Sequence, residues 1–467
     1  MRILRFSVLL AILVGTMGQG TVTQIGSSDA EDATGYSNGH KIGVEHYEAM
    51  SDTLSVVFQS TDSVYFTFTT NRGVSWLNPS AVHQGRYPGI DICHMRFRHL
   101  VWQSLDTTSN TQEVYYDCMD DWHVPINVSQ SSGQSTLPDL VVDSSGVVHI
   151  VWVEEIDGHE YIYYRTVTQY VLGDTLRLSD YGTNEATCTY PSISIFWPAG
   201  RIYAMWECFD PLCYSPYQIH MRYKEGNTWS ATACQAHYLP IRHPSLDYSH
   251  GFDTLSFCYE DSTSGNLEAT FCGGNGGGYA TPGVSTRPMV STVGHTWSYL
   301  FWQEDSAGLN TIDYHLYYQM AGWQRGTFAG SQETARFPNV SGSYVIWTQG
   351  DEPPYEIWFA DFGYPIGIEE NKEQTIMTVR AAPNPFNRNI RIELGRVRDS
   401  NDLRVQIYDV SGRLVREFPV NIRSGHETIA LDWQGDDEQG HSLPAGVYWC
   451  CINENGLKPL LKVIRIR

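Results

Sequence analysis

Short runs of alternating apolar and polar residues, separated by turn sequences, recur along most of the chain. The stretch PDLVVDSSGVVHIVW, residues 138–152, shows the pattern, because two apolar runs flank Asp143-Ser144-Ser145-Gly146. Asp and Gly favour a tight turn and β-branched residues favour strands, so this stretch predicts a β-hairpin. A lone hairpin is only marginally stable in water, so it needs similar hairpins to pack against.

Such hairpins recur, and most begin at a proline and end at an aromatic residue. The copies are Pro88–Trp102, Pro138–Trp152, Pro191–Trp206, Pro244–Tyr259, Pro288–Trp302 and the shorter Pro338–Trp347. Residues 41–59 form an earlier copy without the proline. Each hairpin leads to a third strand, and usually to a fourth. Four-stranded sheets that are apolar on both faces must stack on their neighbours, and radial repetition of such sheets gives a β-propeller.

The repeats predict an all-β fold, with a seven-bladed β-propeller of four-stranded blades over residues 19–364. Six or eight blades stay open as alternatives, because the first and last copies are degenerate. The last copy ends near Tyr364 with only three strands. Residues 21–28 fit the missing fourth strand, so we expect the N-terminal segment to complete the last blade and to remove an exposed edge.

The two ends of the chain have different patterns. Arg2 and Arg5 precede the apolar run 6–14, which is too short to cross a bilayer, so residues 1–18 are predicted to be a signal peptide. No other stretch is apolar enough to span, so no transmembrane segment is expected in the mature chain. Residues 365–376 are polar and predict a linker. Alternating strands over 377–467 predict a small immunoglobulin-like β-sandwich.

Composition narrows the classes of partner and cofactor. The formal net charge is −22 at pH 7, which argues against nucleic acid and anionic lipid as partners. Ten cysteines in an exported chain are expected to include disulfides. We expect Cys258 to face Cys272 across a hairpin, and Cys208 and Cys213 to share a loop near Cys188. No cysteine or histidine set has zinc spacing, so neither a metal nor a cofactor is predicted.

One turn sequence resembles a known motif. TTNRGVSW, residues 69–76, resembles the Asp-box of sialidase-like propellers, S-x-D-x-G-x-T-W, with Gly73 and Trp76 matching. Thr69, Asn71 and Ser75 replace its Ser, Asp and Thr. GNTW, residues 226–229, matches the tail of a second box. The resemblance implies a sialidase-like propeller with these turns between third and fourth strands. It supports the fold more than the activity.

The C-terminal segment resembles two related families, the sorting domain of the type IX secretion system and the immunoglobulin-like domain of the flagellar hook-cap protein FlgD. The resemblance implies handling by type IX secretion machinery, and a place outside the cell or on the outer-membrane surface of a Gram-negative-type bacterium. A plain structural sandwich is the alternative. The matching residues are Pro383, Asn384, Pro385, Phe386, Gly412, Gly446 and Tyr448.

Arginines stand just before four of the repeated prolines, and acids follow the hairpin aromatics. Loops at these two positions lie on the same face of a propeller, so the sequence predicts arginines ringed by carboxylates at one mouth. Arginine's planar fork suits a carboxylate ligand. Mutual neutralisation across blades is the alternative. The candidate residues are Arg86, Arg242, Arg287, Arg336, Glu154, Glu207, Glu260 and Glu304.

These observations favour a secreted binding module for a glycan or another acidic extracellular ligand. A sialidase-like exo-glycosidase is the enzymatic alternative, because sialidases grip a sugar carboxylate with arginines. Such chemistry resembles glycoside hydrolysis with a Tyr nucleophile and an acidic partner, and no such pair can be placed from the sequence, so the catalytic residues are unknown. A structural surface protein that binds nothing is the third alternative.

Overall fold

The computed structural model describes the chain from residue 22 to residue 466, and its described residues form strands and no helix. They fall into two compact units, Met1–Ile366 and Gly367–Arg467. The predicted signal peptide and linker lie outside the described residues. No helix that could span a bilayer occurs in the part of the chain that the structure describes. The other residues outside the description are 36–38, 45–52, 94–95, 121–123, 181–184, 197–199, 238–239, 249–254, 272–274, 280, 282, 294–296, 307, 319–321, 330–332, 363–364, 377, 396–402, 410–413, 421–428 and 454–456.

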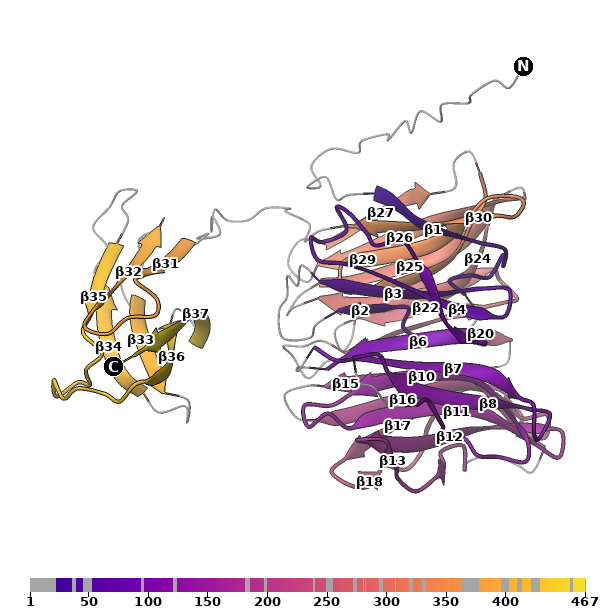
Figure 1. Cartoon of the computed structure of the whole chain (residues 1–467). Coiled ribbons are helices and arrows are strands. Elements are labelled where there is room, and N and C mark those ends of the chain that lie inside the picture. The colour runs from indigo at the N-terminus through magenta and orange to yellow at the C-terminus, as the bar shows by residue number, and fades with distance from the viewer. Residues whose placement is uncertain are drawn as a thin grey trace, which may run out of the picture. The chain divides into compact units, whose positions relative to one another are not determined.

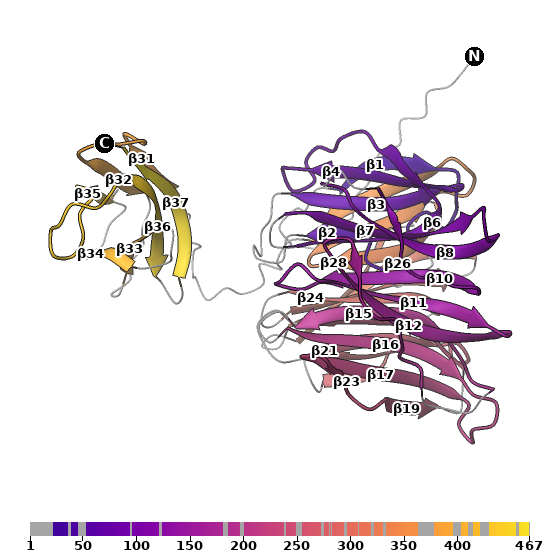
Figure 2. The ribbon, with the colours of Figure 1, turned by 60° about the horizontal axis from the view of Figure 1, so that its bottom comes forward.

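The described strands of the first unit form seven antiparallel sheets, which we number as blades in chain order (Figures 1 and 2). Blade 1 holds β2 (Ile42–Val44), β3 (Leu54–Ser60), β4 (Ser63–Thr69) and β5 (Ser80–Gln84). Blade 2 holds β6 (Arg86–Ile92), β7 (Arg98–Asp106), β8 (Thr111–Cys118) and β9 (Ile126–Asn127). Blade 3 holds β10 (Gln134–Val142), β11 (Val148–Ile156), β12 (His159–Thr168), β13 (Val171–Leu172) and β14 (Leu176–Arg177). Blade 4 holds β15 (Thr187–Phe196), β16 (Arg201–Phe209), β17 (Tyr217–Glu225), β18 (Thr228–Trp229) and β19 (Ala233–His237).

The remaining three blades follow the same plan. Blade 5 holds β20 (Ile241–Tyr248), β21 (Leu255–Asp261), β22 (Asn266–Phe271) and β23 (Asn275–Tyr279). Blade 6 holds β24 (Val284–Val293), β25 (Trp297–Ser306), β26 (Leu309–Tyr318) and β27 (Gly322–Ala329). Blade 7 holds β28 (Ala335–Ser341), β29 (Tyr344–Gln349), β30 (Tyr355–Asp361) and the N-terminal β1 (Val22–Ser28).

The first strands of the blades form a closed ring. In chain order, β2, β6, β10, β15, β20, β24 and β28 each contact the next, and β28 contacts β2. A closed ring of radially stacked antiparallel sheets is a β-propeller. The predicted all-β propeller fold is therefore confirmed.

The N-terminal strand supplies the outer edge of blade 7. In Figure 1 the indigo β1 lies beside the orange β30, and six residue pairs join them from Val22–Ala360 to Ser28–Tyr355. Ile25 is buried in one cluster with Val56, Phe58 and Phe359. The two ends of the propeller sequence thus share one sheet, which leaves β30 with a partner on both sides.

The hairpin aromatics fill the contacts between blades. Trp102, Trp152, Trp206, Trp302 and Trp347 are 0–3% exposed. All five lie in apolar clusters that combine residues of two neighbouring blades, as Trp206 does with Val141 and Val151. Burial of a large aromatic side chain stabilises a fold by about 1.5–3 kcal/mol. The aromatic repeat therefore belongs to the core.

Each repeated proline follows a residue in the left-handed region, and the strand bulges there. The six residues before the prolines have φ between 50° and 55°, and the pairing register shifts across each proline. The bulge turns a backbone N–H toward the preceding blade. These residues are Tyr87, Leu137, Tyr190, His243, Arg287 and Phe337.

Five of these backbone N–H groups donate to a side-chain oxygen in the preceding blade. The acceptor is the residue that directly follows the hairpin aromatic of that blade. We name this contact the blade-junction hydrogen bond. The donor and acceptor pairs are Tyr87 to Gln59 Oε1 (2.6 Å), Leu137 to Gln103 Oε1 (2.9 Å), His243 to Glu207 Oε2 (2.6 Å), Arg287 to Glu260 Oε2 (3.0 Å) and Phe337 to Gln303 Oε1 (3.4 Å). Thr34 donates similarly to Thr348 Oγ1 at 3.2 Å.

One predicted cysteine pairing is wrong. Cys258 lies opposite Ala269 in the β21–β22 ladder and carries a free thiol, while Cys272 lies outside the described residues. The prediction placed the hairpin tip at Gly265. Gly265 instead closes the turn after Asp261 with φ +70°, so the turn centre moves toward the N-terminus and shifts every cross-strand partner. The predicted proximity of Cys188 to Cys208 is confirmed, because the two form a disulfide between β15 and β16.

The second unit holds two sheets that share one core. One sheet contains β31 (Thr378–Ala382), β32 (Ile390–Gly395) and β35 (Ile429–Trp433). The other contains β34 (Leu414–Val420), β33 (Leu403–Asp409), β36 (Gly446–Asn453) and β37 (Leu457–Arg465). Ile392 and Trp433 of the first sheet pack in one cluster with Val405 and Tyr448 of the second. The unit is therefore a β-sandwich.

Candidate functional site

The four candidate arginines lie at the start of first strands, which all begin on the same face of the ring. Arg86, Arg242 and Arg336 stand two residues before the proline, on blades 2, 5 and 7. Arg287 stands directly before Pro288 on blade 6, in the position that His243 holds on blade 5. This face also carries the turns between the second and third strands of the blades. We call it the arginine face.

The four arginines follow one another in an arc around this face, on blades 5, 6, 7 and 2, and three of them contact neighbouring residues. Arg287 donates to His243 Nε2 over 2.6 Å, and its guanidinium lies 5.6 Å from the Phe337 ring centroid. The neighbouring Arg336 pairs with Glu31 at 3.1 Å, and Arg86 pairs with Asp32 at 3.2 Å. The predicted arginines are therefore brought together on one face.

The arginines differ in their exposure and in the partners that they already bind. Arg86 and Arg336 are half-buried and already hold carboxylates of the segment that follows β1. The Arg242 side chain is exposed and makes no hydrogen bond or ion pair within the described residues. Arg242 and Arg287 are thus the pair best placed to receive a new anion.

The four candidate acids fall into two groups, because successive residues of a strand point to opposite faces of the sheet. Glu207 and Glu260 directly follow the aromatic and reach the next blade through blade-junction hydrogen bonds. Glu154 and Glu304 stand one position later and turn into their own blades, where each accepts the indole N–H of its hairpin tryptophan. Ser135 and Ser285 also donate to them. Glu154 and Glu304 therefore hold their blades together.

A histidine that the sequence analysis did not single out lies at the blade 5 end of the arginine arc, where Arg287 contacts it. His243 Nδ1 is 2.9 Å from Glu260 Oε1, and its Nε2 accepts from Arg287. The Tyr190 ring packs edge-on against it, with ring centroids 4.4 Å apart. A comparison of the residues before the prolines could have found it, because only His243 and Arg287 are ionisable cationic residues at that position.

Burial and neighbouring charge set the protonation of this cluster. Burial lowers the pKa of His243 despite its contact with Glu260, so the imidazole is neutral at pH 7. Burial opposes ionisation of Glu260, but His243 and Arg287 outweigh it and hold the pKa of Glu260 below its ordinary value. Burial raises the pKa of Glu207 to about 8, despite the His243 N–H and the nearby arginines. Glu260 is therefore the ionised carboxylate of the pair.

We expect Glu207→Gln to remove a pH dependence of stability. A raised carboxyl pKa means that the folded state keeps a proton which the unfolded chain releases, so wild-type stability falls as pH rises from about 4.5 to about 8. The slope is at most about 1.4 kcal/mol per pH unit. Gln keeps the acceptor for the His243 N–H, as Gln59, Gln103 and Gln303 do at other junctions.

Denaturant unfolding at pH 5 and pH 8.5 measures this effect. The variant should match wild type at pH 5 and exceed its free energy of unfolding by a few kcal/mol at pH 8.5. Glu155→Gln, a change at an exposed neighbouring acid on blade 3, is the matched control and should keep the wild-type slope. Parallel pH profiles for Glu207→Gln and wild type would contradict the assignment.

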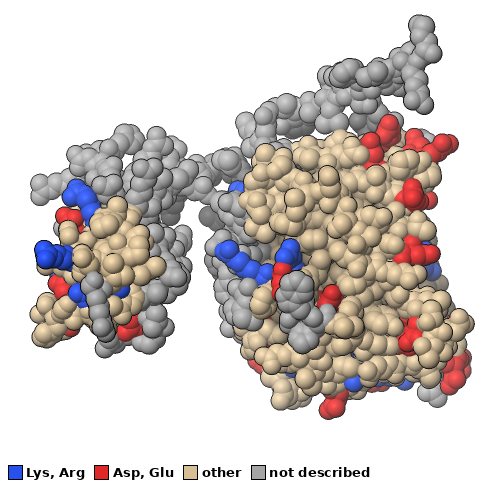
Figure 3. All heavy atoms as spheres, viewed as in Figure 1, with Lys and Arg blue, Asp and Glu red and all other residues tan. Residues whose placement is uncertain are grey.

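Acids surround the arginine face at its rim. Glu155, Asp157, Asp305 and Asp351 are exposed at the turns between second and third strands. Seen from the side, red side chains follow the edge of the propeller at which such turns lie (Figure 3). Like charges at the rim repel an extended polyanion, whereas the inner arginines attract a single acidic group.

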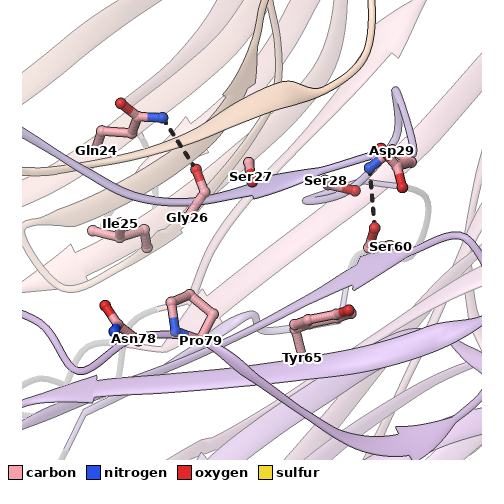
Figure 4. A pocket seen from close by; sticks show the side chains of 10 residues that line it. All are labelled: Gln24, Ile25, Gly26, Ser27, Ser28, Asp29, Ser60, Tyr65, Asn78 and Pro79. Atoms are coloured by element: carbon pink, nitrogen blue, oxygen red, sulfur yellow. Dashed lines mark hydrogen bonds between the residues drawn. The ribbon is translucent and has the colours of Figure 1, made fainter.

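A separate groove of about 470 Å³ lies between β1 and blade 1, as Figure 4 shows. None of the candidate residues lines it. Asp29 and Tyr65 are its titratable side chains, and they offer no paired acid and base. The lining residues are Gln24, Ile25, Gly26, Ser27, Ser28, Asp29, Ser60, Tyr65, Asn78 and Pro79.

The turn with the Asp-box-like sequence connects β4 to β5, the third and fourth strands of blade 1. Asn71 Oδ1 accepts from Thr69 Oγ1 and from the Ser75 N–H, at 2.7 and 3.0 Å. Trp76 donates to the Gly73 carbonyl and packs on Phe359. Gly73 has φ +82°, and a Cβ there would collide with the Phe359 ring, so only glycine fits. The turn joins blade 1 to blade 7 on the face opposite the arginines.

The candidate sorting residues fasten the last strand of the second unit. Asn384 Oδ1 accepts the Ile464 N–H at 2.9 Å. Phe386 exchanges backbone bonds with Ile464 and Ile466, and its buried ring packs on Trp433. Tyr448 donates to the Pro444 carbonyl at 2.7 Å. Gly446 begins β36, Pro383 and Pro385 flank Asn384, and Gly412 lies outside the described residues.

These contacts coincide with a family match. Residues 381–466 match the secretion system C-terminal sorting domain. This sorting tail indicates handling by type IX secretion, so the protein is secreted or lies at the cell surface. The match lies within the second unit.

Other comparisons concern the propeller. No curated protein matches the chain. Polysaccharide lyase Uly1 is 9% identical, with a TM-score of 0.48, over 74% of this chain and 99% of that one. Virginiamycin B lyase from Staphylococcus aureus is 8% identical, with a TM-score of 0.43, over 73% and 99%. Hadza microbial sialidase Hz136 is 11% identical, with a TM-score of 0.34, over 64% of each. These identities assign no activity to this chain.

Proposed function

We propose that this is a secreted or surface-attached propeller that binds a glycan or another acidic extracellular ligand on its arginine face. The observation that carries the proposal is that Arg242 directly precedes His243 in β20, while Arg287 donates to His243 Nε2. The Arg242 guanidinium is exposed, and that of Arg287 is shared with a neutral imidazole. A ligand carboxylate could accept from both in a charge-assisted, planar arrangement.

The charges around the pair favour a short ligand or the end of an acidic chain. The exposed acids of the rim repel a long polyanion, so the acidic group must enter between them. Tyr190 and Phe337 border the same arc and offer apolar ring faces to a sugar. The Asp-box-like turn on the opposite face fits a sialidase-like propeller in this proposal, and the immunoglobulin-like tail fits export.

A glycan array that includes sialylated, uronate-containing, sulfated and neutral glycans tests the proposal. Binding restricted to acidic glycans supports it. Failure to bind any array glycan or any free sugar acid would overturn it and favour the structural alternative.

We expect the double variant Arg242→Ala, Arg287→Ala to weaken binding of an acidic ligand by about 10²-fold or more. Each charge-assisted hydrogen bond contributes about 1.5–3 kcal/mol, and about 1.4 kcal/mol corresponds to tenfold in affinity. Isothermal titration with the strongest acidic array ligand measures the change. Neutral glycans should show no difference.

The matched control is Arg177→Ala, Arg201→Ala, which removes the same charge from the outer strand of blade 3 and from the far end of blade 4. This control should bind like wild type. An unchanged affinity of the first variant, together with a lower melting temperature, would instead show that the arginines only neutralise neighbouring acids.

An enzyme is the second candidate, and one observation favours it. Glu260, His243 and Arg287 form a linked series in which the carboxylate fixes the Nδ1–H tautomer and leaves the Nε2 lone pair toward Arg287. A ligand carboxylate that draws Arg287 away would expose a general base. The sialidase-like alternative has less support, because Tyr259, which donates to Glu268 at 2.6 Å, is itself buried in blade 5.

The same ligands separate binding from catalysis. Turnover of a fluorogenic sialoside or cleavage of a bound acidic glycan, lost in His243→Gln while binding persists, supports the enzyme. Binding without any product supports the binding module.

A further inference from the structure

Four cysteines belong to blade 4, and two of them are already joined. Cys188 on β15 and Cys208 on β16 lie directly opposite each other and form a disulfide, with Cα atoms 4.0 Å apart. Cys213 lies in the loop between β16 and β17, and Cys234 lies on the outer strand β19. The same blade therefore carries two further thiols near an existing disulfide.

These two thiols meet at the side chain of Gln218. Cys234 Sγ donates to Gln218 Oε1 at 3.3 Å, and the Cys213 thiol, which donates to Asp210 Oδ2 at 3.3 Å, lies close enough to Gln218 to be affected by it. Gln218 lies opposite Cys208 in the β16–β17 ladder, and Cys234 lies opposite His220 in the β17–β19 ladder. Gln218 is thus a neighbour of both sulfur atoms.

The loop that carries Cys213 folds back toward β17. The Asp210 N–H donates to the Pro216 carbonyl at 2.8 Å, and the Cys213 N–H donates to the Asp210 carbonyl at 3.1 Å. Gln218 Nε2 donates to the Ser215 carbonyl at 3.2 Å. Gln218 Oε1 also lies 2.6 Å from His220 Nε2, so a rotation of the Gln218 side chain that lets the sulfurs approach would exchange these side-chain hydrogen bonds, while the loop keeps its backbone hydrogen bonds.

Exposure distinguishes this pair from the other described cysteines that lie outside the disulfide. Cys234 is exposed and Cys213 is half-buried, whereas Cys93, Cys118, Cys258 and Cys450 are buried. An exported chain passes through an oxidising compartment, where accessible neighbouring thiols become disulfides. Cys213 and Cys234 are the pair that an oxidant can reach.

We propose that Cys213 and Cys234 form a second disulfide of blade 4. The thiolate of Cys234 attacks the disulfide of an oxidant, a thiol–disulfide oxidoreductase in the periplasm or oxidised glutathione in vitro, and displaces one of its sulfurs as a thiolate. The thiolate of Cys213 then attacks Cys234 in this mixed disulfide and releases the second sulfur. The cysteine pair loses two electrons and two protons, and the oxidant becomes two thiols.

The surroundings of the two thiols make the rate of this oxidation depend on pH. The hydrogen bond to Asp210 and burial raise the pKa of Cys213, and burial raises that of Cys234. The reactive thiolates are therefore scarce at neutral pH, and oxidation by glutathione should be faster at pH 9 than at pH 7.

The two bridges together would tie all parts of blade 4 at the arginine face. Cys188–Cys208 joins the first and second strands beside Glu207, and Cys213–Cys234 would join the loop to the outer strand. A bridge that closes a loop of 21 residues restricts the unfolded chain, so its loss should lower the melting temperature by about 2 °C or more.

Mass spectrometry of the full chain tests the proposal. The purified protein is oxidised with glutathione disulfide, alkylated in its native state and digested with trypsin and Asp-N without reduction. Cleavage before Asp210 separates Cys208 from Cys213, and cleavage after Arg222 or Lys224 separates Cys213 from Cys234. We expect a peptide pair that contains Cys213 and Cys234 and that separates on addition of dithiothreitol.

Single variants supply the control. In Cys234→Ser, Cys213 should become alkylated in the folded protein, and in Cys213→Ser the same should hold for Cys234. Oxidised wild type should melt higher than either variant, and the difference should vanish under reducing conditions. Full alkylation of both cysteines after oxidation would overturn the proposal, as would a peptide that joins either one to Cys188 or Cys208.

Discussion

A chain that lacks residues 19–30 is expected to lose most of the stability of its propeller. This deletion removes β1 and its six residue pairs with β30, and it takes Ile25 out of the cluster that joins blades 7 and 1. Each lost ladder bond costs about 1 kcal/mol, and loss of the buried isoleucine costs about 1.5–3 kcal/mol. The sum is at least about 5 kcal/mol, which reaches the total stability of many domains.

The loss extends beyond the strand itself. Ser28 Oγ donates to the Gln59 carbonyl at 2.7 Å, and the next segment places Thr34 against the Phe337 carbonyl at 2.8 Å. Without β1, the segment that makes these contacts is no longer held against blades 1 and 7. The strand β30 also becomes an open edge that can pair with another chain. Calorimetry and light scattering should show a lower melting temperature and aggregation.

A rearranged chain is the control. Because β1 runs antiparallel to β30, residues 21–28 can follow Asp361 through a short turn and occupy the same place. This chain should recover most of the lost stability. A deletion variant that melts at the wild-type temperature would contradict the role of β1 in closing the ring.

Removal of the second unit is expected to stop export without harm to the propeller. The sorting-domain match covers residues 381–466, and the second unit has an apolar core of its own. A chain that ends at residue 376 should therefore accumulate in the periplasm of a host with type IX secretion. Its purified propeller should melt within about 2 °C of the full chain, a shift that corresponds to less than 1 kcal/mol.

A finer variant separates sorting from the mere presence of a sandwich. Asn384→Ala removes the acceptor of the Ile464 N–H and loosens the terminal strand, while the apolar core with Phe386 remains. Secretion of this variant should fall while the sandwich still folds. Wild-type amounts of the shortened chain in the medium would contradict a sorting role for the tail.

Much of the propeller could be predicted from the sequence, because the same hairpin pattern recurs from blade to blade. Prolines and aromatics mark each hairpin at fixed spacing, so the strand order follows from local patterns alone. The bulge before each proline could not be predicted. Residues before proline usually avoid helical conformations, and Leu137 or Phe337 gives no hint of positive φ. The neighbouring blade fixes that conformation through the blade-junction hydrogen bond.

The residue types of the candidate site could be predicted from the sequence. Their positions relative to the prolines and the hairpin aromatics could be predicted less well. Arg86, Arg242 and Arg336 share one position, but Arg287 occupies the position of His243, which a list of arginines cannot reveal. The acids after the aromatics look alike in sequence, yet a shift of one residue separates Glu207 from Glu304 on opposite faces of their strands. The Cys258 prediction failed for a similar reason, since a turn centre off by one or two residues changes every partner.

The blade-junction hydrogen bond also bears on how such a chain can change during evolution. A unit that begins at the residue before one proline and ends two residues before the next carries the N–H donor to the blade before it and, at the junctions where the bond is described, the acceptor for the blade after it. A duplication or exchange with both breakpoints just before a residue such as His243 or Arg287 therefore keeps every junction complete. The prolines mark natural recombination points, and the side chains of the arginine face can diversify from blade to blade while the bonds that hold the ring together are inherited unchanged.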